Sequence, residues 1–233
     1  MPDLITHYLF AKEAMIKMNK QDQIQPHRAL YDLGCNGPDF FFYYHILPWQ
    51  SKTNKEAIHH LGSLLHQRKI NDFFECLFNA VKQDPSSINY IYTIGYFAHY
   101  FLDRKAHPYI FYFSGVVDES NPSTFIYKYW HKRFEEAIDE NMLIEKENID
   151  FLNLEKKIWY DPCTKEIRNE SFLELYDQAL DEYIEFVEKF DAYLQDKIEI
   201  DELLKQINGL SFETGHQEEF KLKYSRCVYE NGK

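Results

Sequence analysis

The sequence contains few of the residues that interrupt helices or cross-link a chain. Its 233 residues include only 8 glycines and 8 prolines, which excludes a linker-rich or collagen-like protein. The cysteines are widely scattered and form no Cys-x-x-Cys pair, so we expect reduced thiols rather than a disulfide framework. They are Cys35, Cys76, Cys163 and Cys227.

Clustered positive charge and long apolar runs are also missing. The formal net charge is −12 and no basic run is present, so we expect neither nucleic acid nor an anionic membrane as a partner. No apolar run approaches the roughly 18 residues of a transmembrane helix. The N-terminal stretch MPDLITHYLFAKEAM lacks the basic, apolar and small-residue regions of a signal peptide. We therefore expect a cytoplasmic protein, and the oligomeric state stays open.

Aromatic residues and histidines are abundant instead, with 18 Tyr, 19 Phe, 3 Trp and 10 His. Apolar positions repeat with a helical period almost throughout, which predicts an all-α fold. We expect Asp3 or Thr6 to cap the first helix, Gly34 to interrupt the helical pattern, and Pro108 to end the helix before it. The first predicted helix starts at Leu4, and others cover about 55–67, 69–82 and 86–106. A further one ends near residue 144, and the longest covers 171–194.

The chain shows no repeat and no low-complexity segment. We therefore treat residues 1–233 as a single all-α domain, with 145–233 as a helical C-terminal extension that packs on the core. The only soft boundary expected is Asp161-Pro162-Cys163.

Three candidate metal ligands occur four residues apart in the predicted helix 86–106 and just beyond it. His99, Asp103 and His107 share one helix face, because each step of four residues advances by about 40° and roughly 6 Å. The central carboxylate has two oxygens and can bridge two cations about 3.5–4 Å apart. The spacing therefore predicts a bridging carboxylate between two imidazoles.

Other candidate ligands lie on different predicted elements. His131 and Glu135 form a second pair at helical spacing, which suits zinc or a similar divalent ion. His7, Asp39 and His66 lie on the first helix, on a Gly-Pro loop and in an apolar helix. Each has a structural alternative, since a histidine on an apolar face is often a hydrogen-bonded core residue and Asp39 can be a turn residue.

The remaining histidines and the aromatic run 40–44 have weaker claims. His59 and His60 are adjacent, so at most one can join a site, and His27, His45 and His216 are expected at the surface or behind the ligands. The run 40–44 is expected in the core, with Phe40 as a candidate for lining a substrate pocket.

Together these residues resemble the zinc-dependent phospholipase C family, whose all-α fold is shared with the S1/P1-type nucleases. The resemblance covers residues 6–135 and rests on separate pieces in the family's order. They are Thr6-His7-Tyr8-Leu9-Phe10, Gly37-Pro38-Asp39-Phe40-Phe41, Gly62-Ser63-Leu64-Leu65-His66, residues 95–103 with His107-Pro108, and His131 with Glu135.

The resemblance implies a cluster of two or three zinc ions, with iron or manganese as possible replacements, held between the helices of the bundle. One ion is implied to bind Asp39, His66, His99 and Asp103, and a second His107, His131 and Glu135. His7 and Asp103 are implied to contribute to a third. Three divalent ions add +6 to a chain of charge −12, so the site can attract a phosphate although the protein is acidic.

The function expected from these residues is hydrolysis of a phosphodiester by metal-activated water, with Asp39 as general base as well as ligand. A small phosphodiester or a phospholipid head group is the expected substrate. One alternative is a nuclease or nucleotide phosphodiesterase of the same fold, which requires a basic strand-binding surface. Another is a metal-binding helical protein without turnover.

Overall fold

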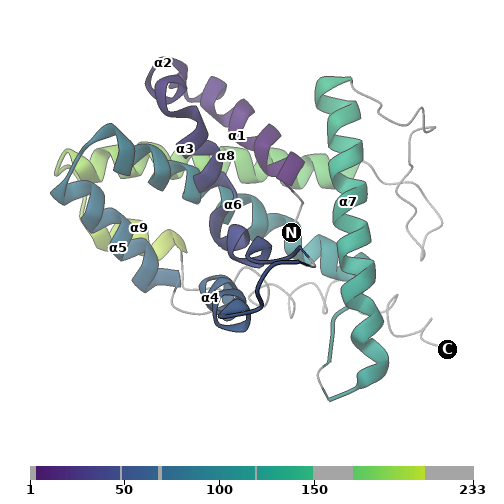
Figure 1. Ribbon diagram of the computed structural model, residues 1–233. Coiled ribbons are helices and arrows are strands. Elements are labelled where there is room, and N and C mark those ends of the chain that lie inside the picture. The colour runs from purple at the N-terminus through teal and green to yellow at the C-terminus, as the bar shows by residue number, and fades with distance from the viewer. Residues whose placement is uncertain (1–3, 48, 68–69, 119, 149–169, 208–233) are drawn as a thin grey trace.

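The computed structural model describes residues 4–47, 49–67, 70–118, 120–148 and 170–207 (Figure 1). Every regular element in these ranges is helical, so the predicted all-α fold is confirmed. The helices are α1 (Leu4–Lys17), α2 (Gln21–Ile24), α3 (Arg28–Cys35), α4 (Lys55–Gln67), α5 (Ile70–Gln83), α6 (Ser87–Ser114), α7 (Ile126–Glu147), α8 (Glu170–Leu194) and α9 (Ile200–Ile207). Short 3-10 helices are η1 (Gln25–His27), η2 (Gly37–Tyr43) and η3 (Pro122–Phe125).

Helix α6 lies at the centre of the bundle and contacts α1, α3, α5, α7 and α8 (Figure 1). The prediction that Pro108 ends this helix is wrong, because α6 has 28 residues and continues to Ser114. A proline inside a helix forfeits one backbone hydrogen bond and costs about 3 kcal/mol. Tyr109 and Ile110 beyond it are fully or almost fully buried, and this burial offsets the cost. Helix α6 is therefore longer than α8, which was expected to be the longest.

The abundant aromatic residues form the interface of α6 with α5 and α8. Phe97 of α6 packs against Phe74 and Phe78 of α5 and against Phe186 and Phe190 of α8, with ring centroids 5.0 to 5.8 Å apart. Most of these pairs are edge-to-face, the arrangement that the ring quadrupole favours. The aromatic core thus fixes the central helix from the side opposite its chemically active residues.

Glycine allows α3 to approach α6 closely. Gly34 lies inside α3 rather than interrupting it, which corrects the expectation from sequence. A Cβ atom on Gly34 would lie 2.5 Å from the carbonyl oxygen of Tyr92, and one on Gly95 would lie 2.5 Å from that of Tyr31. The two helix backbones therefore touch where only glycine fits, and the segment that follows α3 is brought against the middle of α6.

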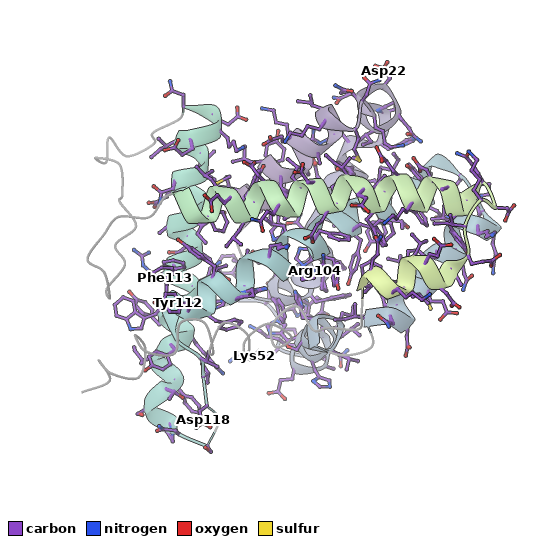
Figure 2. The ribbon with its side chains drawn as sticks, turned by 180° about the vertical axis from the view of Figure 1, so that it is seen from behind. Asp22, Lys52, Arg104, Tyr112, Phe113 and Asp118 are labelled. Carbon is purple, nitrogen blue, oxygen red and sulfur yellow. The ribbon has the colours of Figure 1, made fainter. Side chains whose placement is uncertain are left out.

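Helix α7 stands along one side of the bundle and packs against α1 and α6 (Figure 1). Arg104 of α6 lies beside α8, where it and Lys105 pair with Glu182 (Figure 2). The prediction of a single domain stays a prediction, and Asp161-Pro162-Cys163 lies outside the described residues. Within the described ranges, no helix combines the length and apolar character needed to cross a bilayer.

Candidate metal centre

All eight residues predicted as ligands converge on the central helix. Helix α6 supplies His99, Asp103 and His107 from one face, as the four-residue spacing predicted. The other ligands come from α1 (His7), η2 (Asp39), α4 (His66) and α7 (His131 and Glu135). All are buried except His131, whose side chain is 21% exposed.

Within the part of the chain that the structure describes, these residues form three groups that could each hold a cation. The ligand atoms within a group lie no more than 4.8 Å apart. The His7 trio is His7, His99 and Asp103; the Asp39 trio is Asp39, His66 and His99; the Glu135 trio is His107, His131 and Glu135. His99 is thus shared between the first two trios, whereas the resemblance implied Asp103 as their shared member.

The carboxylate of Asp103 divides its two oxygens between imidazoles on different helices. Its Oδ1 lies 3.1 Å from Nε2 of His7, and its Oδ2 lies 3.2 Å from Nε2 of His99 and 3.8 Å from Nδ1 of His107. Two ligands of a tetrahedral zinc, each about 2.1 Å from the metal, are roughly 3.4 Å apart. The spacing around Asp103 therefore fits a carboxylate that touches more than one cation.

The Asp39 trio is oriented by backbone contacts. Asp39 lies in the 3-10 helix η2 rather than on a loop, and its backbone N–H donates to the carbonyl of Asn36 at 3.0 Å. His66 donates from Nδ1 to the carbonyl of Gly62 at 2.8 Å, so its Nε2 carries the lone pair. That Nε2 lies 2.9 Å from Oδ1 of Asp39. Two acceptors at this distance require a proton or a metal ion between them.

The Glu135 trio joins the far part of α6 to α7. Nε2 of His131 lies 2.8 Å from Oε1 of Glu135, one helical turn further along α7. Its other ring nitrogen lies 3.4 Å from the hydroxyl of Ser114, the last residue of α6. The rings of His107 and His131 stack with their centroids 5.9 Å apart. Because α6 continues past Pro108, Ser114 reaches this trio, a contact that the shorter predicted helix would have lost.

Gly37 makes room for the histidine shared by two trios. It has a φ of +50°, and a Cβ atom at this position would lie 2.1 Å from Cδ2 of His99. Glycine is therefore required both by the backbone conformation and by the approach of η2 to α6. Gly37 was expected from sequence to break a helix, but this contact was missed because His99 lies 62 residues further along the chain.

Burial sets the protonation states of the ligands. It lowers the pKa of His99 to about 4 against the opposing charges of Asp103 and Asp39, and it holds the pKa of His107 well below its usual value. Burial alone would raise the pKa of Asp103, but the facing imidazoles, His99 first, keep it well below its ordinary value. At neutral pH His99 and His107 are therefore neutral imidazoles and Asp103 is an ionised carboxylate, the forms that bind metal.

Several buried ligand atoms make no hydrogen bond. Among the described residues, both nitrogens of His7, both oxygens of Asp103, Oδ1 of Asp39 and Nδ1 of His107 make none. Burying such groups without a partner costs about 1–3 kcal/mol each, which native proteins usually avoid. Imidazole nitrogens and carboxylate oxygens are the donors that zinc prefers, so the chemistry of the set fits zinc ions.

Other sequence candidates lie outside the trios. His27, His45, His59 and His60 join none of them, and His216 is outside the described residues. The expectation that the run 40–44 is core is wrong, because Phe40 is 37% and Tyr43 50% exposed. Phe42 stacks on the ligand His66, with the ring centroids 5.6 Å apart. The role of Phe40 in substrate binding stays a prediction.

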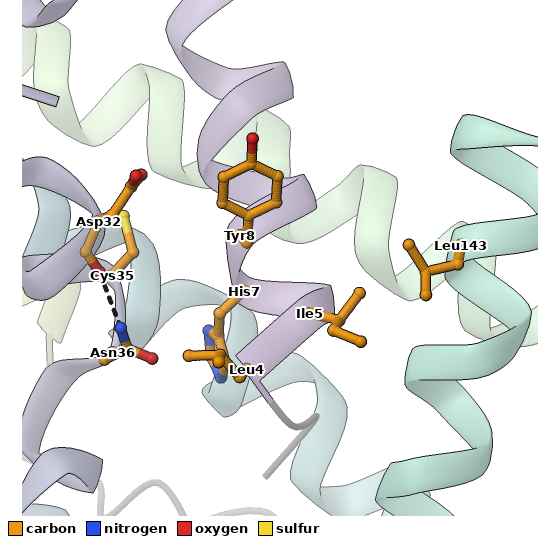
Figure 3. A pocket seen from close by; sticks show the side chains of 8 residues that line it. All are labelled: Leu4, Ile5, His7, Tyr8, Asp32, Cys35, Asn36 and Leu143. Carbon is orange, nitrogen blue, oxygen red and sulfur yellow. Dashed lines mark hydrogen bonds between the residues drawn. The ribbon is translucent and has the colours of Figure 1, made fainter. Parts of the chain in front are cut away.

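An apolar pocket of 360 Å³ opens beside His7. Figure 3 shows its lining along α1, between α3 on one side and Leu143 of α7 on the other. The lining residues are Leu4, Ile5, His7, Tyr8, Asp32, Cys35, Asn36 and Leu143. His7 belongs both to this pocket and to the metal centre, so the pocket reaches the edge of the site.

A helical bundle with buried His and Asp trios between its helices defines a class of all-α metalloproteins. The family model described as zinc-dependent phospholipase C matches residues 6–190. The chain therefore belongs to the zinc-dependent phospholipase C family, and the family together with the trios supports a metal-dependent hydrolase. No curated protein and no solved structure gives a significant match to the chain.

Proposed function

We propose that this protein hydrolyses a phosphodiester, with a phospholipid as the substrate class. The observation that carries the proposal is Asp103, a buried carboxylate whose two oxygens face imidazoles from separate helices. Two or three zinc ions would be held by the three trios, although iron or manganese suits the same donors. When bound, such ions supply positive charge to the phosphate oxygens and lower the pKa of a coordinated water toward about 7.

Two residues have distinct roles beyond binding metal in this proposal. Asp39 accepts the proton of the attacking water at a carboxylate oxygen, a role supported by its Oδ1, which lies 2.9 Å from Nε2 of His66 inside the cluster. His131 is the most exposed of the eight ligands, which makes its trio the entrance for substrate.

The apolar pocket beside His7 favours a phospholipid over a fully water-soluble phosphodiester. Its lining includes Leu4, Ile5, Tyr8 and Leu143, which suit the glyceride part of a lipid rather than a base or a sugar. A nuclease would need a basic strand-binding surface, and the formal charge of −12 speaks against one. The cytoplasmic location predicted from sequence remains part of this proposal.

Three substrates distinguish the alternatives: a chromogenic phosphodiester, phosphatidylcholine in mixed micelles, and single-stranded DNA, each assayed on zinc-loaded protein. We expect release of a phosphorylated head group from the lipid and little cleavage of DNA. Preferential cleavage of DNA would establish the nuclease alternative, and zinc binding without turnover of any substrate would establish the non-catalytic one.

The Asp39→Asn variant tests the general base, and Asp22→Asn, an exposed change on α2, is its matched control. Removal of a general base lowers rates by about 10²–10⁴. We expect a loss in this range for Asp39→Asn and none for Asp22→Asn. Because Asp39 is also a proposed ligand, zinc content is measured alongside. Full activity of Asp39→Asn would remove it from the reaction.

A further inference from the structure

A buried carboxylate outside the trios caps the helix that carries His7. Asp139 of α7 is 5% exposed and accepts three hydrogen bonds from the start of α1. The backbone N–H of Ile5 donates to its Oδ2 at 3.0 Å, and that of Thr6 donates to its Oδ1 at 2.9 Å. The hydroxyl of Thr6 donates to the same Oδ1 at 2.5 Å. Its position in the sequence suggested that Thr6 caps the helix, but its hydroxyl instead donates to Asp139.

A side chain from another helix binds the first described N–H groups of α1. The first N–H groups of a helix have no partner within the helix and carry partial positive charge. A side-chain cap is normally supplied by the residue just before the helix, and so from the same chain segment. Here Asp139 contacts two consecutive N–H groups and a hydroxyl, so α7 fixes both the end of α1 and its rotation about its own axis.

The residue that follows this contact in the chain is a proposed metal ligand. His7 follows Thr6 in the chain, and its Nε2 lies 3.1 Å from Oδ1 of Asp103. Asp139 also lies one helical turn beyond Glu135 on α7, so a single helix carries a ligand of the Glu135 trio and the anchor of the His7 trio. The position of His7 relative to the Glu135 trio thus depends on Asp139.

We propose that Asp139 is a positioning residue of the metal centre, which holds His7 in place by capping α1 from α7. The inference rests on the proposed function, because it assigns Asp139 to the same zinc cluster. Residues that orient a ligand typically change metal affinity by about 10–100-fold when they are replaced. The zinc ion bound through His7 should therefore be weakened selectively, while an ion in the Glu135 trio is retained.

The test measures zinc stoichiometry and affinity by titration of metal-free protein, without any substrate. We expect Asp139→Asn to bind one zinc ion, the one held through His7, at least about tenfold less tightly. Glu136→Gln, a charge-removing change at a more exposed position of the same helix, should leave all affinities unchanged. The same loss should occur in His7→Ala, and adding Asp139→Asn to His7→Ala should weaken zinc binding no further.

A purely structural role predicts a different pattern. In that case Asp139→Asn would lower thermal stability but leave zinc affinity at the wild-type value. Alternatively, it would weaken zinc binding equally in protein with His7 and in His7→Ala. Either result overturns the proposal. Should Asp139→Asn not fold, Thr6→Ala removes one of the three hydrogen bonds and should cause a smaller loss in the same direction, which Thr6→Ser should not. Because no substrate is used, normal zinc binding without hydrolysis would refute the proposed function and leave this inference intact.

Discussion

Replacing Asp103 by asparagine tests the bridging carboxylate directly. The change keeps the shape of the side chain and removes one negative charge from a site that is 0% exposed. The imidazole nitrogens around it lie 3.1 to 3.8 Å from its oxygens, so a cation bound among them is within about 4 Å of the carboxylate. At this distance, a pair of unit charges is worth about 4 kcal/mol at an effective dielectric constant of 20. Zinc affinity should therefore fall by a factor of about a thousand.

The assay is elemental analysis of protein dialysed against a weak chelator, followed by hydrolysis of the preferred substrate. We expect Asp103→Asn to lose at least one zinc equivalent and essentially all activity. Asp181→Asn, an exposed change on α8, is the matched control and should lose neither. The zinc-loaded variant should also melt at a lower temperature than zinc-loaded wild type. Unchanged zinc content in Asp103→Asn would refute the bridging role.

Two further changes probe the support of the site and of the bundle. Gly37→Ala places a Cβ atom against the ring of His99, so we expect lost zinc and at least a tenfold drop in hydrolysis; retention of both would show that η2 can shift away. Glu182→Gln probes an ion pair: burial raises the pKa of Glu182, but the hydrogen bond of Lys105 and the charge of Arg104 bring it below its ordinary value of 4.5. A depressed pKa in the folded protein stabilises it above pH 4.5, and this contribution is lost as the pH falls through the lower folded value. The free energy of unfolding, measured in urea at pH 7 and pH 3, should change less between these pH values in Glu182→Gln than in wild type. An equal change would show that this ion pair does not contribute to the pH dependence of stability.

The positions of several helices could be predicted from the sequence, because apolar spacing and capping residues are local signals. The expected ranges 55–67 and 69–82 agree with α4 and α5 to within one residue, and 171–194 agrees with α8 equally well. The errors fall at Pro108 and Gly34, where a local rule predicts a break. In both cases tertiary packing prevails, through the burial of Tyr109 and Ile110 beyond the proline and through the close approach of α3 to α6.

The exposed aromatic run at 40–44 shows a similar limit. Five consecutive aromatic residues suggested burial, yet η2 has a three-residue period and only part of its surface meets α4 and α6. Phe42 packs on His66, whereas Phe40 and Tyr43 are exposed. Composition therefore indicated how many aromatic residues the fold must place, but not which of them lie inside.

By itself the sequence determined the all-α class and the line of His99, Asp103 and His107, because both follow from the period of one helix. Only the tertiary structure decided which ligands meet: His7, Asp39 and His66 come from three further elements, and their approach depends on contacts far apart in the chain. The same holds for Asp139, which has no motif around it and acquires a role only because α7 packs against the start of α1. Local periodicity places side chains along one helix, whereas the packing of separate helices sets the distances between them.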